Sequence, residues 1–158
     1  MAQAMEQTKQ KEIQAWMKNR NIKNHDNWET PKDLYDTLND EFNFDFDPCP
    51  IYYKEITPDK DGLLIDWGKR NFINPPYSKK LKEAFVKKAI QESKKNKLCV
   101  MLLPVSTSTV LFHDYIKPHA KEIRFLKGRV RFVGINTFGK KVENKAGMHD
   151  SMIVIFES

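Results

Sequence analysis

Several features that would define a function class are scarce or missing in this chain of 158 residues. Its only cysteines, Cys49 and Cys99, lie far apart without a CxxC pair, so no zinc site is predicted and free thiols in a reducing compartment are expected. No apolar run approaches the ~20 residues that span a bilayer. Residues 1–20 also lack the apolar stretch of a secretion signal, and we therefore expect a cytoplasmic protein without membrane contact.

The length and composition that remain are those of one globular domain. Hydrophobic residues make up 40% and charged residues 30% of the chain, which is ordinary for a folded protein with a single core. The net charge of +6 suits a nucleic-acid partner without demonstrating one. The four histidines have no metal-binding spacing, so no metal is expected. We divide the chain into a polar helical arm with a linker, residues 1–27, and a main domain, residues 28–158.

Strands and helices alternate along the main domain. Helices are predicted from residue 31 to about 41, behind the cap Thr30, and directly after Ser78. Strands are predicted at 44–46, 63–66, 72–73, 98–103, 123–126, 130–133 and 152–156. A short helix that stops before Pro118 and a polar loop over 134–149 complete the pattern. This alternation predicts an α/β fold whose sheet is mostly parallel, with a hairpin-like antiparallel C-terminal edge.

The tetrapeptide Asn74-Pro75-Pro76-Tyr77 is the most informative motif. The Asn74 side-chain oxygen and the Pro75 carbonyl can each accept a hydrogen bond from a planar amine. The two prolines hold the backbone rigidly, so that both acceptors point at one spot, and Tyr77 can stack on a base. The motif therefore suits methyl transfer to a weakly nucleophilic amine such as that of adenine, whose lone pair is delocalised into the ring.

Other suggestive segments fall where an open α/β sheet binds its ligands, outside the carboxyl ends of the strands. The N-terminus of the first predicted helix is a natural place for a carboxylate. S-adenosylmethionine carries a carboxylate and an ammonium group, and so needs an anion holder and an acidic side chain. The segments concerned are Trp28-Glu29-Thr30-Pro31, Asp47-Pro48-Cys49 and Asp66-Trp67.

Seven short stretches between Trp28 and Phe156 are informative because of the order in which they occur. They are residues 28–31, 46–49, 61–63, 66–67, 74–78, 102–104 and 128–132. In this order the chain resembles the phage-type DNA N6-adenine methyltransferases, the small Dam-like family of bacteriophages and prophages. The resemblance implies a single-domain, Rossmann-like methyltransferase fold that uses S-adenosylmethionine and has no separate target-recognition domain. One departure is that the segment after Asp47 lacks the Gly-x-Gly loop of many methyltransferases.

The resemblance also implies roles for individual residues. Thr30 and its neighbours would hold the methionine end of S-adenosylmethionine, and Asp47 would face its ammonium group. Asn74 and the Pro75 carbonyl would accept hydrogen bonds from the target N6 amine, and Tyr77 would stack on the flipped base. The full set implied for the cofactor is Trp28, Glu29, Thr30, Pro31, Asp47, Pro48, Cys49, Asp66 and Trp67, and the set implied for catalysis is Asn74, Pro75, Pro76 and Tyr77.

Candidate DNA contacts are less sharply defined. They are Ser78, Lys79, Arg129, Arg131, Lys140 and Lys141. Lys79 adjoins the motif and is the best phosphate ligand among them. Arg129 and Arg131 alternate on a predicted strand and so share a face, which fits DNA contact and simple solvation equally well. Only the 134–149 loop and the N-terminal arm are spare for base recognition, so short or relaxed sequence specificity is expected.

Two other functional hypotheses stay open at this stage. The same motif would serve another planar amine, namely an RNA adenine, the N4 amine of cytosine or a protein glutamine. The second hypothesis is a relic of the fold that binds nucleic acid without catalysis. The intact Asn74-Pro75-Pro76-Tyr77 motif argues against it. The oligomeric state, monomer or dimer, is not determined by these patterns.

Overall fold

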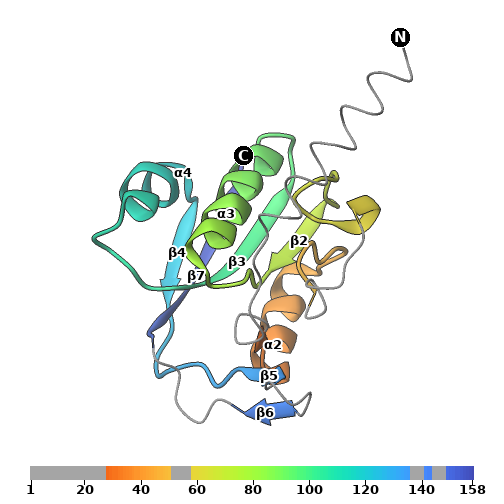
Figure 1. Ribbon diagram of the computed structural model, residues 1–158. Coiled ribbons are helices and arrows are strands. Elements are labelled where there is room, and N and C mark those ends of the chain that lie inside the picture. The colour runs from red at the N-terminus through yellow and green to blue at the C-terminus, as the bar shows by residue number, and fades with distance from the viewer. Residues whose placement is uncertain (1–27, 51–57, 136–140, 144–148) are drawn as a thin grey trace.

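The computed structural model describes residues 28–50, 58–135, 141–143 and 149–158. The predicted N-terminal arm and Lys140 therefore lie outside the described residues. The centre of the fold is a four-stranded sheet in the order β2-β3-β7-β4 (Figure 1). Its strands are β2 (Arg70–Ile73), β3 (Leu98–Pro104), β7 (Ser151–Glu157) and β4 (Glu122–Phe125).

The strand directions confirm the α/β class but not every detail expected of the sheet. β2 and β3 pair in parallel, whereas β7 is antiparallel to both of its neighbours, β3 and β4. The expected mostly parallel pairing is therefore not confirmed. The predicted place of the C-terminal strand at an edge is wrong, because β7 lies inside the sheet. Residues 151–156 are all buried, and a strand that is buried on both faces gains most from a neighbour on each side.

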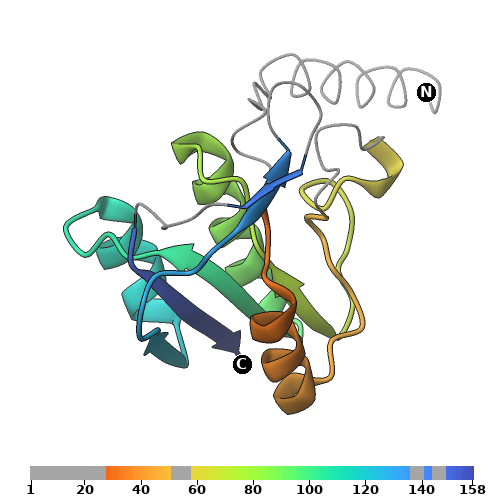
Figure 2. The same cartoon turned by 90° about the horizontal axis from the view of Figure 1, so that it is seen from below.

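Helices cover both faces of this sheet. On β3, Cys99, Met101 and Leu103 pack toward α3 (Lys79–Ser93), while the alternate residues pack toward α2 (Lys32–Phe42). This follows from the two-residue period of a strand, which sends successive side chains to opposite faces. Figure 1 shows α3 lying across the sheet, and Figure 2 shows α2 on the other side. The result is a three-layer domain with two hydrophobic clusters.

The helices begin close to where the sequence predicts them. α3 starts after Ser78 and buries Leu81, Phe85 and Ala89 at helical spacing, as an amphipathic pattern requires. The predicted helix stop before Pro118 is wrong. A wide π-helical turn, η4 (Leu111–Ile116), runs into α4 (Lys117–His119), which contains Pro118 near its start. The Lys117 N–H still bonds to the Phe112 carbonyl, so the helix continues up to the proline, whose own nitrogen has no hydrogen to donate.

A second, three-stranded sheet joins distant parts of the chain. It has the order β1-β5-β6 and is antiparallel throughout, with β1 (Trp28–Glu29), β5 (Val133–Ile135) and β6 (Lys141–Glu143). The predicted polar loop over 134–149 is thus wrong where β5 and β6 form, and the strand expected at 130–133 starts only at Val133. The reason is tertiary, since Glu29 pairs with Val133 from far along the chain.

Two short predicted strands are also absent from the structure. Of residues 44–46, only Phe46 forms a bridge, parallel to Asn71 of β2. Residues 61–65 form a turn in which the Asp61 carbonyl accepts hydrogen bonds from the N–H groups of Leu64 and Ile65. This turn follows the short 3-10 helix η3 (Pro58–Lys60). A Cβ at position 62 would collide with the Pro48 carbonyl, so only glycine allows the turn to pack on that segment.

Candidate functional site

Three of the predicted site segments lie along one edge of the main sheet. Asn74 directly follows β2 and so stands at its carboxyl end. Asp47 follows Phe46, which runs parallel to β2 beside Asn71, and so points to the same edge. Thr30 reaches this edge from between β1 and α2, because the Asn74 Nδ2 donates a hydrogen bond to its Oγ1 over 3.1 Å. This is the edge at which open α/β sheets bind ligands.

The hydroxyl of Thr30 has a different role from the predicted helix cap. The cap position of α2 is Pro31, without a side-chain cap bond, so the predicted helix start is displaced by one residue. Thr30 is partly buried, as is Asn74, while Pro75 and Pro76 are buried. The two prolines thus fix the backbone that follows Asn74, and the hydrogen bond to Thr30 fixes the Asn74 side chain. Glu29 is exposed and takes part in β1.

Tyr77 is held more deeply than a freely stacking ring would be. Its ring meets that of Phe132 at 83°, with the centroids 5.7 Å apart. Its hydroxyl is buried without a hydrogen-bond partner among the described residues, and burial raises the pKa of Tyr77 well above its usual value. The Ser78 hydroxyl is likewise buried without a described partner. The predicted DNA contact of Ser78 therefore has no support from its position.

Asp47 is the acidic group at this edge. Burial by the surrounding chain raises the pKa of its carboxyl to about 6, although a hydrogen bond from the Cys49 N–H to Oδ1, 2.9 Å long, opposes the rise. By its accessible surface the residue is nevertheless exposed, so screening by water reduces the effect. Pro48 and Cys49, the two residues that follow, are buried.

Tyr35 of α2 is a neighbour of Asp47 that sequence reasoning missed. Burial raises the pKa of Tyr35, and the negative charge of Asp47 raises it further, which places the two side chains within electrostatic reach. The ring packs edge-on against Phe72 of β2, with the centroids 5.3 Å apart. The available signal was its position one turn after Pro31, whose carbonyl accepts the Tyr35 N–H.

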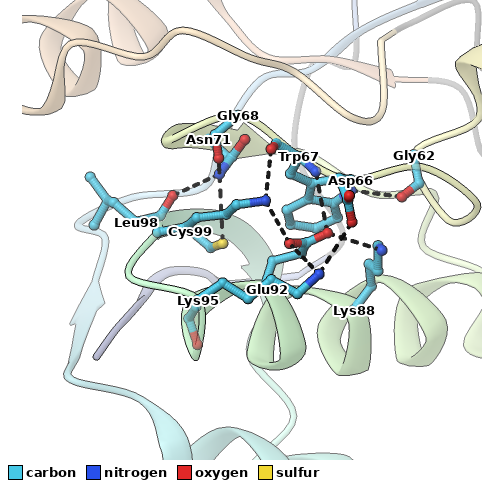
Figure 3. Close-up of polar contacts among 12 residues, drawn as sticks. Gly62, Asp66, Trp67, Gly68, Asn71, Lys88, Glu92, Lys95, Leu98 and Cys99 are labelled. Atoms are coloured by element: carbon cyan, nitrogen blue, oxygen red, sulfur yellow. Dashed lines mark hydrogen bonds and ion pairs between the residues drawn. The ribbon is translucent and has the colours of Figure 1, made fainter.

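Asp66 and Trp67 lie at the opposite edge, before β2 begins (Figure 3). The Trp67 indole donates to the Gly62 carbonyl over 2.6 Å, and the Trp67 carbonyl accepts a hydrogen bond from Lys97. Asp66 forms an exposed ion pair with Lys95 at 3.2 Å. The structure does not bring these two residues to Asn74. Their predicted cofactor contact remains a prediction that their position does not favour.

Glu92 organises this opposite edge and was also missed. Its side chain is fully buried, and its carboxylate lies 2.8 Å from Lys97 and 3.0 Å from Lys88 (Figure 3). It also accepts a hydrogen bond from the Trp67 N–H. Burial alone would raise the pKa of Glu92, but the bonds from Lys97 and Lys88 outweigh burial and hold it at about 2. The end of α3 is thereby tied to the segment that leads into β2.

A cavity of about 370 Å³ opens beside the first turn of α3. Buried apolar side chains line it, among them Leu103, Ile116 and Met152, together with Lys79 and Lys82 of α3. Burial lowers the pKa of Lys82, and the charge of Lys79 adds to that while Glu83 opposes it. Lys79, which is exposed, thus stands between the motif and this cavity.

The remaining predicted DNA contacts are scattered. Arg129 and Arg131 are exposed, but they precede β5 in an irregular segment, so the predicted strand face that they would share is absent. Gly128, with a φ of +75°, turns the chain into this segment, and Arg129 lies 3.7 Å from Asp150. Lys141 belongs to β6. Within the part of the chain that the structure describes, no cluster of three potential metal ligands occurs, and no helix is long and apolar enough to cross a membrane.

Comparison with known proteins gives one family. The profile of the family described as DNA N-6-adenine-methyltransferase (Dam) matches residues 17–158. A protein of Escherichia phage T1 named DNA N-6-adenine-methyltransferase is 32% identical over 113 residues, which is 65% of this chain and 45% of that relative. The chain thus spans a little under half the length of the curated relative. No solved structure matches. Because the family profile covers most of the sequence, the chain belongs to the DNA N-6-adenine-methyltransferase (Dam) family.

Proposed function

We propose that the protein transfers a methyl group from S-adenosylmethionine to the N6 amine of adenine in DNA. The observation that carries this proposal is the placement of Asn74 at the carboxyl edge of β2, with its amide held by Thr30 and its backbone continued by two buried prolines. Family membership, and the name of the phage T1 relative, favour this target over RNA, cytosine or a protein amide.

The proposed fold is a Rossmann-like methyltransferase domain. β7 is antiparallel to both β3 and β4, so β2, β3 and β4 all run in one direction. Phe46 extends the same direction by its bridge to Asn71. With helices on both faces, this arrangement supports a doubly wound sheet with a ligand edge at its carboxyl end.

The residues at that edge fit S-adenosylmethionine. When bound, it supplies a methyl group on a positively charged sulfur. Asp47 would face its ammonium group, because a carboxyl with a pKa of about 6 is mostly ionised at neutral pH. The 29–31 segment and the 48–49 segment would border the methionine end. Thus an acidic side chain and a helix start stand on the same edge as Asn74, as the two charges of the cofactor require.

Asn74 would act on the target amine. Its Oδ1 and the Pro75 carbonyl would each accept a hydrogen bond from one N–H of the adenine N6 amine and so keep electron density on the nitrogen. The nitrogen lone pair would form the new N–C bond as the C–S bond of the methyl donor breaks, and the amine would then lose a proton to water. Tyr77 would stack on the flipped base, and the contact with Phe132 would hold its ring in place.

Exposed basic side chains would bind the phosphates. Lys79 adjoins the motif at the first turn of α3, and Arg129 and Arg131 lie in the segment that leads to β5. We include Lys140 and Lys141 from the sequence alone. The net charge of +6 agrees with such a partner.

The test is transfer of tritiated methyl from S-adenosylmethionine to unmethylated DNA, followed by digestion to nucleosides. We expect label in N6-methyl-2′-deoxyadenosine, reduced roughly 10²–10³-fold by Asn74→Ala, which removes one preorganised acceptor. Gln91→Ala, on the exposed face of α3, is the matched control and should react like the wild type. Label found only in RNA, in protein or in cytosine would contradict the proposal.

A further inference from the structure

The hydrogen bond between Asn74 and Thr30 joins two segments that are 44 positions apart in the sequence. Thr30 sits in a well-supported place. The preceding residue, Glu29, pairs with Val133 in the small sheet, and the following residue, Pro31, accepts the Tyr35 N–H in the first turn of α2. Its hydroxyl is therefore presented to Asn74 by two rigid elements rather than by a free loop.

The direction of this bond matters because the two ends of an amide have opposite hydrogen-bonding character. The Nδ2 end of Asn74 donates and the Oδ1 end accepts. With Nδ2 directed at Thr30 Oγ1, Oδ1 is turned to the other side of the side chain. An amide rotated by 180° would instead present a donor to the N6 amine, which is also a donor. Methyl transfer thus requires one of the two amide orientations.

We propose that Thr30 is a positioning residue for methyl transfer, whose hydroxyl holds the Asn74 amide in the orientation that accepts the target amine. This inference rests on the proposed function. It also departs from the role that the family resemblance implies for Thr30, which is contact with the cofactor. On the present assignment Thr30 acts on the target side of the reaction, through Asn74, and the cofactor affinity does not depend on its hydroxyl.

Three variants of the full chain separate these roles. Thr30→Val keeps the branched shape and removes the hydroxyl, whereas Thr30→Ser keeps the hydroxyl and removes the methyl group. Thr37→Val is the matched control, since the exposed Thr37 hydroxyl in α2 bonds only locally to the Asp33 carbonyl, at 2.9 Å. Each variant is measured for kcat and for KM with unmethylated DNA, for the Kd of S-adenosylmethionine by calorimetry, and for the thermal midpoint of unfolding.

We expect Thr30→Val to lower kcat roughly 10- to 100-fold, since a misdirected acceptor acts in the transition state. Its Kd for S-adenosylmethionine and its KM for DNA should stay within about threefold of the wild type, because the lost interaction acts only in the transition state. Thr30→Ser should recover most of the lost kcat, and Thr37→Val should match the wild type. If Thr30→Val fails to fold, Thr30→Ala takes its place in the comparison with Thr30→Ser.

Several results would overturn the inference. Unchanged kcat in Thr30→Val would do so and would leave the proposed function standing, because the wild type still methylates DNA. A weakened Kd for S-adenosylmethionine with kcat retained at saturation would return Thr30 to the cofactor site. A Thr30→Ser variant as slow as Thr30→Val would mean that shape, and not the hydroxyl, is required. A wild type that transfers no methyl group to DNA would overturn the inference together with the proposed function.

Discussion

Asp47 is the site residue whose charge depends most on pH. Its pKa is raised by burial to about 6 from an ordinary 3.8. The folded protein therefore keeps a proton that the unfolded chain releases between these values, so this group's contribution to stability falls as the pH rises through that window. The proposed cofactor contact has the opposite dependence, because only the ionised carboxylate attracts an ammonium group.

We predict that S-adenosylmethionine binds more weakly as the pH falls below about 6, by at most about tenfold per pH unit. Calorimetry between about pH 5 and about pH 7.5 measures this affinity, since the Asp47 charge changes within that range. Asp47→Asn should bind weakly at every pH, with a flat profile, whereas Asp66→Asn should keep the wild-type slope. A slope that survives in Asp47→Asn would assign the titration to another group.

Glu92 offers a second prediction at the scale of single residues. Its carboxylate is buried against Lys88 and Lys97, so Glu92→Gln leaves these amines without their counter-charge. We expect the free energy of unfolding to drop by roughly 2–4 kcal/mol, near the range for breaking a buried ion pair. Asp66→Asn, which removes an exposed partner of Lys95, should cost less than about 1 kcal/mol. Chemical denaturation at pH 7 compares the three proteins.

The pH dependence of stability checks the same group. The folded-state pKa of Glu92 is depressed to about 2 from an ordinary 4.5. Its stabilisation is therefore complete above the unfolded value and is lost as the pH falls from 4.5 toward 2. In Glu92→Gln this acid-sensitive component should be missing. If wild type and variant lose stability in parallel over that range, Glu92 is not the group responsible.

Individual residues also show where sequence reasoning stops. The motif at Asn74 could be predicted, because proline and asparagine at that spacing have few other uses. Its partner Thr30 could not, since a threonine before a proline is equally a helix cap, and only the fold decides which bond it makes. The strand predicted at 63–66, whose end Asp66 and Trp67 would mark, is wrong because the apolar triplet 63–65 imitates a strand. The structure has a turn there, closed on Asp61.

At the scale of elements, the segment before β5 connects the small sheet to the motif. Phe132 is buried, with 6% of its surface exposed, and packs against Tyr77 in the cluster beneath α2. We predict that Phe132→Ala lowers the free energy of unfolding by about 3–5 kcal/mol, as expected for a buried aromatic side chain. It should also lower kcat, because Tyr77 loses the ring that holds it.

A nearby aromatic residue supplies the control for this change. Phe125 of β4 is 64% exposed, so Phe125→Ala should change stability by less than about 0.5 kcal/mol. Phe132→Leu, which fills most of the same space, should recover part of both stability and kcat. Denaturation and methyl transfer are measured on all three variants. Full activity in a folded Phe132→Ala would contradict the supporting role of this contact.

Elements with a strong local pattern were predictable and those that depend on distant pairing were not. α2, α3 and β3 carry helical spacing or an unbroken apolar run, and they form within a residue or two of their predicted positions. β5 and β6 are three residues each, with a glycine in the middle of β5 and a charged residue at each end of β6, so they look like a loop. Their strand structure depends on pairing with each other and with β1, which is a tertiary contact that no local window contains.

At the scale of the whole molecule, the proposed site occupies one edge of the main sheet and the ion pairs of Glu92 occupy the other. Asn74, Thr30 and Asp47 gather at the carboxyl ends of the strands, whereas Glu92 and its lysines gather at the amino ends. Because of this separation, we expect changes at Glu92 to lower stability without removing a residue of the proposed site. It also places the exposed Lys79 on the edge proposed to face DNA, and the exposed Lys69, next to the start of β2, on the edge proposed to face away.

This difference between the two edges of the sheet predicts how salt affects DNA binding. Each lysine or arginine that neutralises a phosphate releases counterions, so the logarithm of the association constant falls with the logarithm of salt concentration by about 0.9 per contact. Lys79→Gln and Arg131→Gln should each weaken binding to all DNA sequences alike and reduce this slope by about 1. Lys69→Gln removes the same charge from the opposite edge and should leave the slope unchanged. Fluorescence anisotropy over a salt series measures all four proteins. If Lys69→Gln reduced the slope as much as Lys79→Gln, binding would follow net charge rather than a defined face, and the DNA would not be held against the edge where Asn74 lies.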